Sequence, residues 1–117
     1  AMAANTTYEF ELWLIFQSGA TPDFKLAFTV PAGATLAWGV RHDARDLTGT
    51  GGSAQTSSGG AISVLMPTGV YNQAMGFLGL VRCGATTGNL QLQWAQDTAT
   101  VADTTVYAES FLKYWTR

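Results

Sequence analysis

The residues best suited to acid–base or metal chemistry gather at one place in this 117-residue chain. His42, Asp43, Arg45 and Asp46 form its one cluster of charged side chains. Catalysis would require a nucleophile or a metal ligand to join them in a defined geometry. The chain has one histidine and one cysteine, too few nitrogen and sulfur ligands for zinc or copper, and the aspartates lack the periodicity of a calcium loop. We interpret the cluster as a polar loop with local salt bridges, or as a loop that contacts a ligand.

Glu9 and Glu11 are the second group with possible chemistry. Glycosidases place two carboxylates on either side of the bond that they cleave, normally from different elements. Residues two apart on a strand point to the same face, so these glutamates lie side by side. We interpret them as solvent-facing or hydrogen-bonded groups near a strand end.

The remaining nucleophiles and glycine-rich loops do not form a known catalytic motif. No serine stands in a Gly-x-Ser-x-Gly elbow, and no Lys-Ser/Thr pair or helix follows Gly49-Thr50-Gly51-Gly52 as a phosphate loop requires. Cys83 cannot form an internal disulfide and is expected to be a small packed thiol near a strand end. The sequence therefore predicts a protein that is not an enzyme and that uses no metal and no cofactor.

The composition indicates a folded β-protein with unusually little charge. Hydrophobic residues make up 47% and charged residues 12%, about half the charged fraction of an average domain. The net charge of −2 and the scattered basic residues argue against nucleic acid or an anionic membrane as partner. Four Trp, four Tyr and six Phe are too many for a disordered chain. We expect a neutral surface that partners cover in part.

The dominant sequence period is two, which is typical of β-strands. Alternation predicts strands over residues 8–17, 24–30, 36–41, 62–66, 75–81, 90–95 and 106–115. The segment 75–81 is apolar on both faces and should lie centrally or in an interface, whereas the Gly/Ser/Thr-rich stretch 43–60 predicts a long functional loop. The pattern predicts one all-β domain over residues 1–117, a jelly-roll-like antiparallel β-sandwich of seven to eight strands.

The alternation also separates predicted core residues from predicted contact residues. The positions expected to fill the sandwich are Phe10, Leu12, Leu14, Phe28, Trp38, Leu92 and Trp94. Trp13, Ile15 and Trp115 interrupt the polar face of their strands, and large apolar residues outside a core mark an interface. Together with Phe111 they form our predicted subunit contact. An exposed tryptophan could instead serve as a stacking platform for carbohydrate.

Several segments are distinctive as sequence: Tyr8-Glu9-Phe10-Glu11, residues 25–34, residues 84–96, Thr104-Thr105-Val106 and Ser110-Phe111-Leu112-Lys113. Together they resemble the C-terminal β-domain of bacteriophage virion proteins of the tail-fibre-like or minor structural kind. The resemblance covers nearly the whole chain, is weakest over residues 41–61 and contains no catalytic motif. The closing segment is also similar to the last strand of trimeric jelly-roll heads of the complement and tumour-necrosis-factor type.

The chain departs from the resembled family at two places. Family members carry a further segment, rich in Ser/Thr and then Asp, before the strand that begins at Tyr8. We therefore expect a piece of a longer virion protein, or a first strand supplied by another chain. Glu109 stands where the family implies Gly, so the closing strand is expected to differ locally.

The resemblance implies a non-enzymatic virion domain that forms a homotrimer and presents loops to a host-surface glycan or protein, with neither nucleic acid nor membrane as partner. The residues expected in the recognition loops are Arg41, His42, Asp43, Arg45, Asp46, Asp97 and Asp103. Two alternatives remain open. One is a capsid decoration protein that binds the capsid shell, and the other is a monomeric carbohydrate-binding module.

Overall fold

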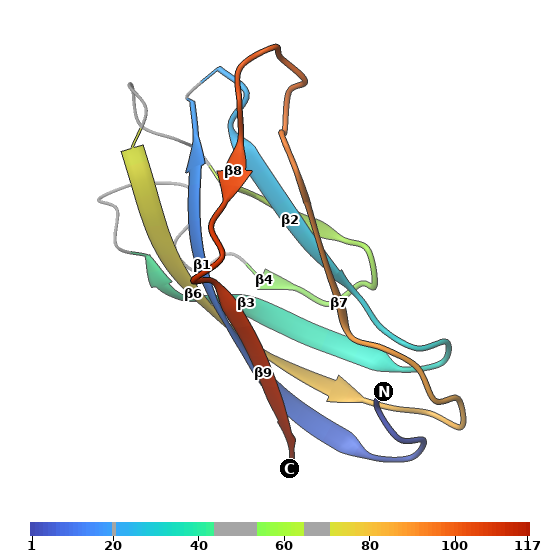
Figure 1. Cartoon of the computed structure of the whole chain (residues 1–117). Helices are drawn as coiled ribbons and strands as arrows, with labels where there is room; N and C mark the ends of the chain where they lie inside the picture. Colours follow the sequence, from blue (N-terminus) through green and yellow to red (C-terminus); the bar gives the residue numbers. More distant parts are fainter. Residues whose placement is uncertain (20, 44–53, 65–70) are drawn as a thin grey trace.

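The computed structural model consists of two antiparallel β-sheets that face each other across an apolar core (Figure 1). It describes residues 1–19, 21–43, 54–64 and 71–117. Over these ranges the chain forms nine strands and no helix. The prediction of an all-β, sandwich-like antiparallel fold is therefore confirmed.

The larger sheet has the strand order β4-β3-β6-β1-β8, and β9 also pairs with β1. Its strands are β1 (Thr7–Ser18), β3 (Thr35–Asp43), β4 (Ala54–Gln55), β6 (Tyr71–Arg82), β8 (Thr105–Val106) and β9 (Phe111–Thr116). β1 and β6 pair along their whole length. β6 lies between β1 and β3, which confirms the central position predicted from its two apolar faces.

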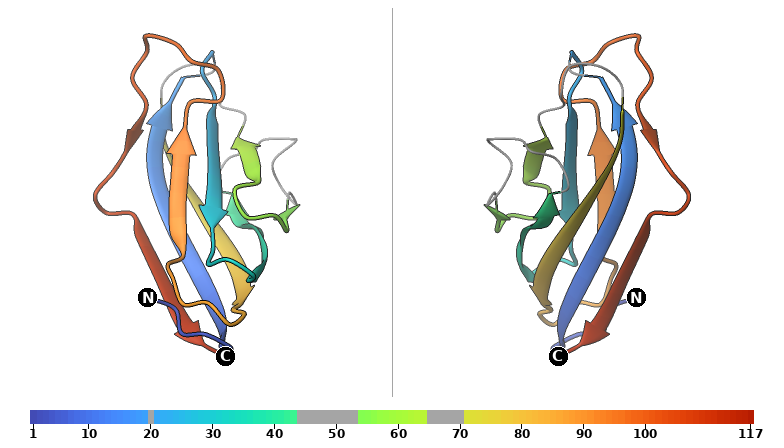
Figure 2. Two further views of the ribbon diagram at one scale, coloured as in Figure 1. Left: turned by 90° about the vertical axis from the view of Figure 1, so that its right-hand side faces the viewer. Right: turned by 90° about the vertical axis from the view of Figure 1, so that its left-hand side faces the viewer.

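The smaller sheet has three described strands in the order β5-β2-β7. They are β2 (Phe24–Thr29), β5 (Ala61–Val64) and β7 (Gln91–Ala95). Figure 2 shows that β8 and β9 lie to one side of this sheet, beyond β7. The smaller sheet therefore covers the middle of the larger one and leaves β9 outside the sandwich.

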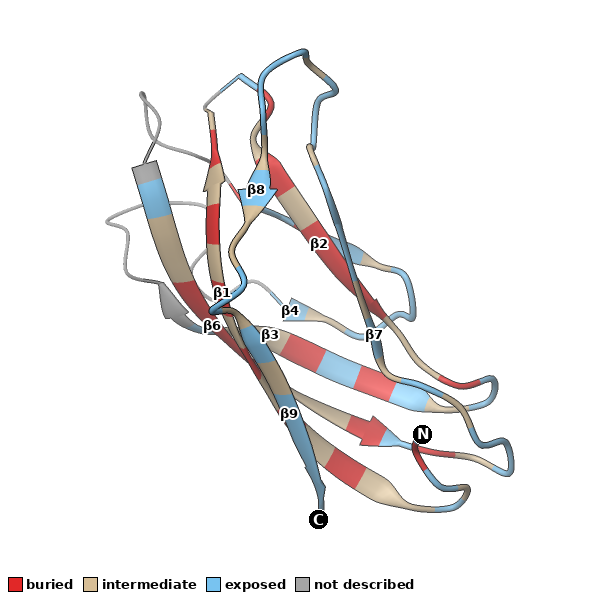
Figure 3. Cartoon of the chain, viewed as in Figure 1, coloured by how far each residue is buried: buried red, intermediate tan, exposed pale blue. Residues whose placement is uncertain are grey.

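The core forms where the two sheets overlap, and its burial follows the predicted alternation. Along β1, buried and partly exposed residues alternate without a break (Figure 3). The ring of Phe28 packs 4.7 Å from that of Phe10 and 5.0 Å from that of Trp38, between ring centroids. Five predicted core residues are buried as expected: Phe10, Leu12, Leu14, Phe28 and Trp38. Leu92 is partly buried against the same core.

The prediction that Trp94 fills the core is wrong, because 43% of this residue is exposed. Trp94 pairs with the buried Leu26 and so lies on the inner side of its sheet. However, β7 is an edge strand of the smaller sheet. Strand alternation defines which side a residue faces but not whether another sheet covers that position.

The predicted closing strand over residues 106–115 is interrupted. β8 and β9 both pair with β1, and the register shifts by two residues between them. At the break, the Ser110 hydroxyl accepts a hydrogen bond from the Ile15 amide (2.9 Å) and donates one to the Ile15 carbonyl (3.1 Å). This side chain therefore replaces a strand pairing at the break. Because the shift is even, each residue keeps its predicted face.

The structure also describes parts of the predicted loop over residues 43–60, the first residues of the chain, and Cys83. β3 extends through Asp43 and β4 lies at Ala54–Gln55, so residues 43–60 are not one continuous loop. Met2 is buried in the core and its amide donates to the Gly88 carbonyl, so the first residues belong to the fold. Cys83 is a free, buried thiol, as predicted.

Gly79 on β6 leaves the space that two core aromatics occupy, and its replacement tests the packing. It stands opposite Phe10 on β1 and Trp38 on β3, and an added Cβ would overlap the ring of Phe10. We expect Gly79→Ala to lower the free energy of unfolding by about 2–3 kcal/mol, measured by urea denaturation. Adding Phe10→Leu should recover part of this loss. An unchanged stability for Gly79→Ala would contradict the packing described here.

Candidate functional site: the outer face of the larger sheet

The larger sheet gathers the four residues predicted at a subunit contact on its outer face. Trp13 on β1 stands opposite Phe111 on β9, and Glu9 stands opposite Trp115. Residues directly opposite each other project to the same side of a sheet. Ile15 follows Trp13 on this face of β1, away from the buried Leu14. Side chains far apart in the sequence therefore form one apolar strip along β1 and β9.

The strand β9 is exposed on both of its faces. Phe111 is 49% exposed and Trp115 40% exposed on the outer face. On the inner face, Tyr114 is 45% exposed although its ring packs edge-on against that of Tyr8, with ring centroids 5.6 Å apart. The exposure of Tyr114 follows from the arrangement of the sheets, because β9 lies beyond the smaller sheet, whereas Phe111 and Trp115 lie on the face that the smaller sheet does not cover.

A shallow groove of about 880 Å³ crosses the outer face from β4 to β9. Its floor is apolar and comes from the central strands. The residues of the floor are Ala37, Leu78, Gly79 and Leu80. Leu78 is 43% exposed, an unusual position for a leucine in the middle of a sheet. The β9 side of the groove carries Lys113, Trp115 and Arg117.

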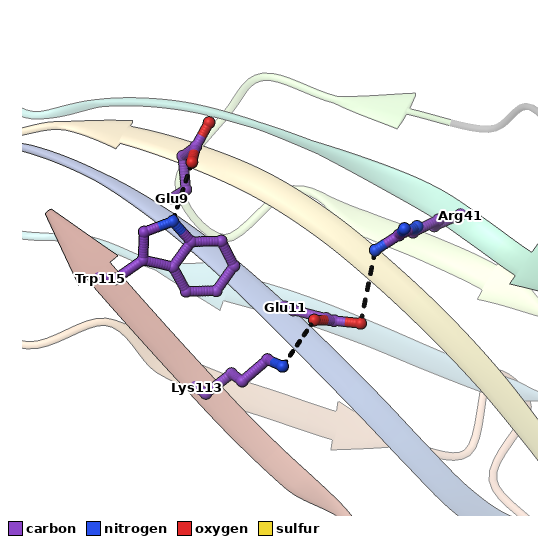
Figure 4. Close-up of polar contacts among 5 residues, drawn as sticks. All are labelled: Glu9, Glu11, Arg41, Lys113 and Trp115. Atoms are coloured by element: carbon purple, nitrogen blue, oxygen red, sulfur yellow. Dashed lines mark hydrogen bonds and ion pairs between the residues drawn. The ribbon is translucent and has the colours of Figure 1, made fainter. Parts of the chain in front are cut away.

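The two glutamates of this groove are neutralised by neighbouring strands (Figure 4). Glu11 Oε2 lies 3.0 Å from Lys113 Nζ on β9, and Glu11 Oε1 lies 3.5 Å from Arg41 Nη1 on β3. The Trp115 indole donates a hydrogen bond to Glu9 Oε2 (2.9 Å), and Arg117 Nε lies 3.7 Å from Glu9 Oε1. The interpretation of the glutamates as hydrogen-bonded groups is therefore confirmed.

The charges of the groove tie β9 to the sheet. Each oxygen of Glu9 and of Glu11 has one partner, a cation or an indole N–H, in a neighbouring segment of the same chain. An apolar floor whose charges are paired within the chain is a surface suited to contact with another surface.

The predicted recognition residues are spread over different parts of the fold. Arg41 lies on β3 and lines the groove, so it belongs to a strand, as the alternation over residues 36–41 predicts, and not to a recognition loop. His42 and Asp43 are the last two residues of β3. Arg45 and Asp46 lie outside the described residues. Asp97 and Asp103 are exposed in the loop that follows β7.

The loop of residues 96–104 is built around one amide side chain. Gln96 Nε2 donates to the Ala102 carbonyl (2.6 Å) and to the Thr104 hydroxyl (3.1 Å), while Gln96 Oε1 accepts from the Thr100 amide (2.9 Å). The Thr98 amide also donates to the Pro22 carbonyl (2.8 Å). These hydrogen bonds hold the backbone of the loop on which the exposed Asp97 and Asp103 lie.

The sequence analysis missed the cations that hold the glutamates. Lys113 and Arg117 alternate with Trp115 along the last strand, and Glu9 and Glu11 alternate along the first. Opposite charges at alternating positions of two strands are a sign of cross-strand ion pairs. This signal identifies candidate partners only once the two strands are known to be neighbours, because the pattern does not show which strands pair.

The described residues offer no site for a metal, since no three His, Cys, Asp or Glu side chains gather within them. Within the same residues, no helix has the length and apolar character needed to cross a membrane. The groove itself contains ion pairs, an indole and an apolar floor.

The fold and this face define a class: an all-β protein of two antiparallel sheets with an exposed apolar and ion-paired outer surface. Comparison with protein-family models, with curated proteins and with solved structures finds no match to the chain. The function proposed below therefore rests on the residues of this chain.

Removing the charge of Glu11 tests whether its ion pairs contribute to stability. We expect Glu11→Gln to lower the free energy of unfolding by about 0.5–1 kcal/mol at low salt, with the difference shrinking in about 0.5 M NaCl. The matched control is Glu109→Gln, since Glu109 is exposed and meets no cation within ion-pair distance in the described part of the chain. A loss that is equal at both salt concentrations would contradict an ionic origin.

Proposed function

We propose that this chain is a non-enzymatic structural domain of a bacteriophage virion that forms a homotrimer and presents its loops to a host surface. The observation that carries the self-association is the set of large apolar side chains exposed on the outer face of the larger sheet, namely Leu78, Phe111 and Trp115. A surface of this kind on a small β-domain marks a contact with another protein. Closed symmetric assembly of identical chains is the commonest way to bury it.

The subunit contact in this proposal is the strip formed by Trp13, Ile15, Phe111 and Trp115, extended by the groove. An aromatic side chain buries about 150–250 Å² when it is fully covered, so this strip offers a large gain on association. The charges on the face support the same role. Because Glu9 and Glu11 are paired within their own chain, covering the face leaves no carboxylate without a partner.

The strand pairing supports a jelly-roll-like topology. β1 pairs with β9, β2 with β7 and β3 with β6. These pairs are nested in the sequence, because the strands of each pair lie between those of the pair before it. Two further pairs, β1 with β6 and β2 with β5, tie this arrangement together. We propose a jelly-roll-like sandwich on the basis of the nested pairs.

The virion location is proposed from the resemblance to tail-fibre-like and minor structural proteins. In this proposal the partner beyond the trimer itself is a host-surface glycan or protein, contacted through the loops that include Asp97 and Asp103. The exposed loop of residues 96–104 supports a recognition role, because its polar groups are held in place by Gln96.

Truncating the aromatic strip tests the subunit contact. We expect Phe111→Ala and Trp115→Ala each to weaken association by about tenfold or more, because aromatic residues dominate the energy of interfaces. The measurement is molar mass by light scattering over a range of micromolar concentrations. Trp94→Ala is the matched control, since Trp94 is exposed to a similar extent on the smaller sheet. A drop in mass for the control equal to that for Trp115→Ala would contradict the proposed contact.

Locating the domain on the particle tests the virion role. Antibodies raised against this chain should label the tail fibres of purified virions of the encoding phage in electron micrographs. Label over the capsid shell would contradict the tail location and favour the decoration protein, and particles without label would contradict the virion role altogether.

A further inference from the structure

We propose that β9 pairs edge to edge with β9 of a second copy of this chain, in antiparallel orientation and with Tyr114 at the centre of the pair. Within the described residues β9 pairs with β1 alone, so one of its long edges is open. This pairing does not depend on the trimer proposed above. It is made by the backbone at the edge of the larger sheet, whereas the trimer contact is made on the outer face.

The hydrogen-bonding groups of the open edge follow from the register of β9 on β1. The Arg117 amide donates to the Thr7 carbonyl (2.9 Å), and the neighbouring residues Thr116 and Tyr8 stand opposite each other. Hydrogen-bonded and non-hydrogen-bonded pairs alternate along an antiparallel ladder. The backbone groups of every second residue therefore point away from β1, namely those of Leu112, Tyr114 and Thr116. An unpaired row of this kind is a template for a further strand.

These backbone groups restrict the register that a second β9 can adopt. Residues that face the open edge must pair with one another, since only they present free N–H and C=O groups there. A pair centred on Tyr114 meets this condition along the whole strand, because Tyr114 then stands opposite its own copy and Leu112 opposite Thr116. Pairs centred on Lys113 or on Trp115 also meet the condition, but over a shorter overlap.

The side chains on the outer face select the same register. Along β9 they alternate between aromatic and cationic residues, in the order Phe111, Lys113, Trp115 and, just after the strand, Arg117. Centring on Tyr114 places Lys113 opposite Trp115 of the other copy. It also places Phe111 opposite Arg117, so that each cation meets an aromatic ring. Centring on Lys113 would place two lysines opposite each other. Centring on Trp115 would place Lys113 opposite Arg117, and both arrangements bring like charges together.

The described contacts show that these cations are able to take up aromatic neighbours. Lys113 Nζ lies 5.9 Å from the ring centroid of Phe111 and 6.0 Å from that of Trp115 in its own chain, within reach of a cation–π contact. The side chains of Lys113 and Arg117 remain 58% and 57% exposed. Both therefore have open surface on which a ring of another copy can lie. On the inner face, the exposed Tyr114 would meet its own counterpart.

The edge pair is a weak contact. Two strands of 6 residues each bury little area, and small interfaces lie at the weak end of protein association. We expect a Kd of about 1 mM. Pairs are then scarce in the micromolar range, where the mass of the trimer is measured. On a particle that holds many copies close together, effective concentrations reach the millimolar range, and the pairs would link neighbouring trimers.

Exchange of backbone amide hydrogens with water, measured by NMR on the unmodified chain, tests the pairing. We expect the exchange rates of the Leu112, Tyr114 and Thr116 amides to fall by about twofold between about 0.05 mM and about 2 mM protein, as a Kd of about 1 mM requires. The amides of Lys113 and Trp115 face β1 and serve as internal controls. Their exchange rates should not depend on concentration.

Disulfide trapping tests the register. Residue 114 stands opposite its own copy, and a hydrogen-bonded pair has a Cα–Cα separation of about 5.5 Å, which a disulfide can span. We expect Tyr114→Cys to form covalent dimers on oxidation at millimolar concentration, seen on non-reducing gels. Thr116→Cys is the matched control on the same edge, since its sulfur atoms would lie more than about 10 Å apart in the pair. It should form several-fold less covalent dimer. Cys83 is buried, and the wild type measures its background.

Edge amides whose exchange is independent of concentration would overturn the pairing, as would equal dimer yields from Tyr114→Cys and Thr116→Cys. Protection that appears only when a synthetic peptide of residues 7–13 is added would assign the edge to a foreign strand and overturn self-pairing. Failure of the edge pair is distinct from failure of the trimer. A trimer without edge protection overturns the edge pair alone, and a monomer with concentration-dependent protection overturns the trimer alone.

Discussion

The two sheets differ in width, because six described strands belong to one and three to the other. Three strands cover the middle of the larger sheet, and the core of interlocking phenylalanines forms there. β9 lies past the edge of this cover. It pairs with β1 along one edge, and of its side chains Leu112 is partly buried against the core while Phe111, Tyr114 and Trp115 stay exposed. The exposure of Tyr114 on the inner face follows from this difference in width, whereas Phe111, Trp115 and the ion-paired glutamates lie on the outer face, which the smaller sheet does not cover.

The outer face of the larger sheet is also where several of the chain's few charged residues are used. Much of the small number of charged residues is used at one place, where Glu9 and Glu11 meet Arg41, Lys113 and Arg117. These pairs connect β9 and the residue after it to the rest of the sheet, with three cations against two carboxylates. The two exposed tryptophans differ in support: Trp115 is held by a hydrogen bond to Glu9, whereas Trp94 is held by a stack of core rings.

Much of the fold could be predicted from alternation alone. The strands and the inner face of β1 follow from it, since residues such as Phe10 and Leu12 repeat with a period of two. Alternation cannot show where a sheet ends, which is why Trp94 was misplaced. It also cannot show register, so the partners of Glu11 were missed. The break before β9 depends on the Ser110 hydroxyl replacing backbone hydrogen bonds, a local substitution that the apolar pattern does not reveal.

The central claim is that the uncovered side of the larger sheet is closed by further copies of the same chain. Sedimentation equilibrium of the unmodified protein tests this claim most directly, because it reports mass without assumptions about shape. A trimer predicts a mass near three times the 12.4 kDa of the chain, maintained as the protein is diluted through the micromolar range. A mass of one chain at every concentration would contradict the claim.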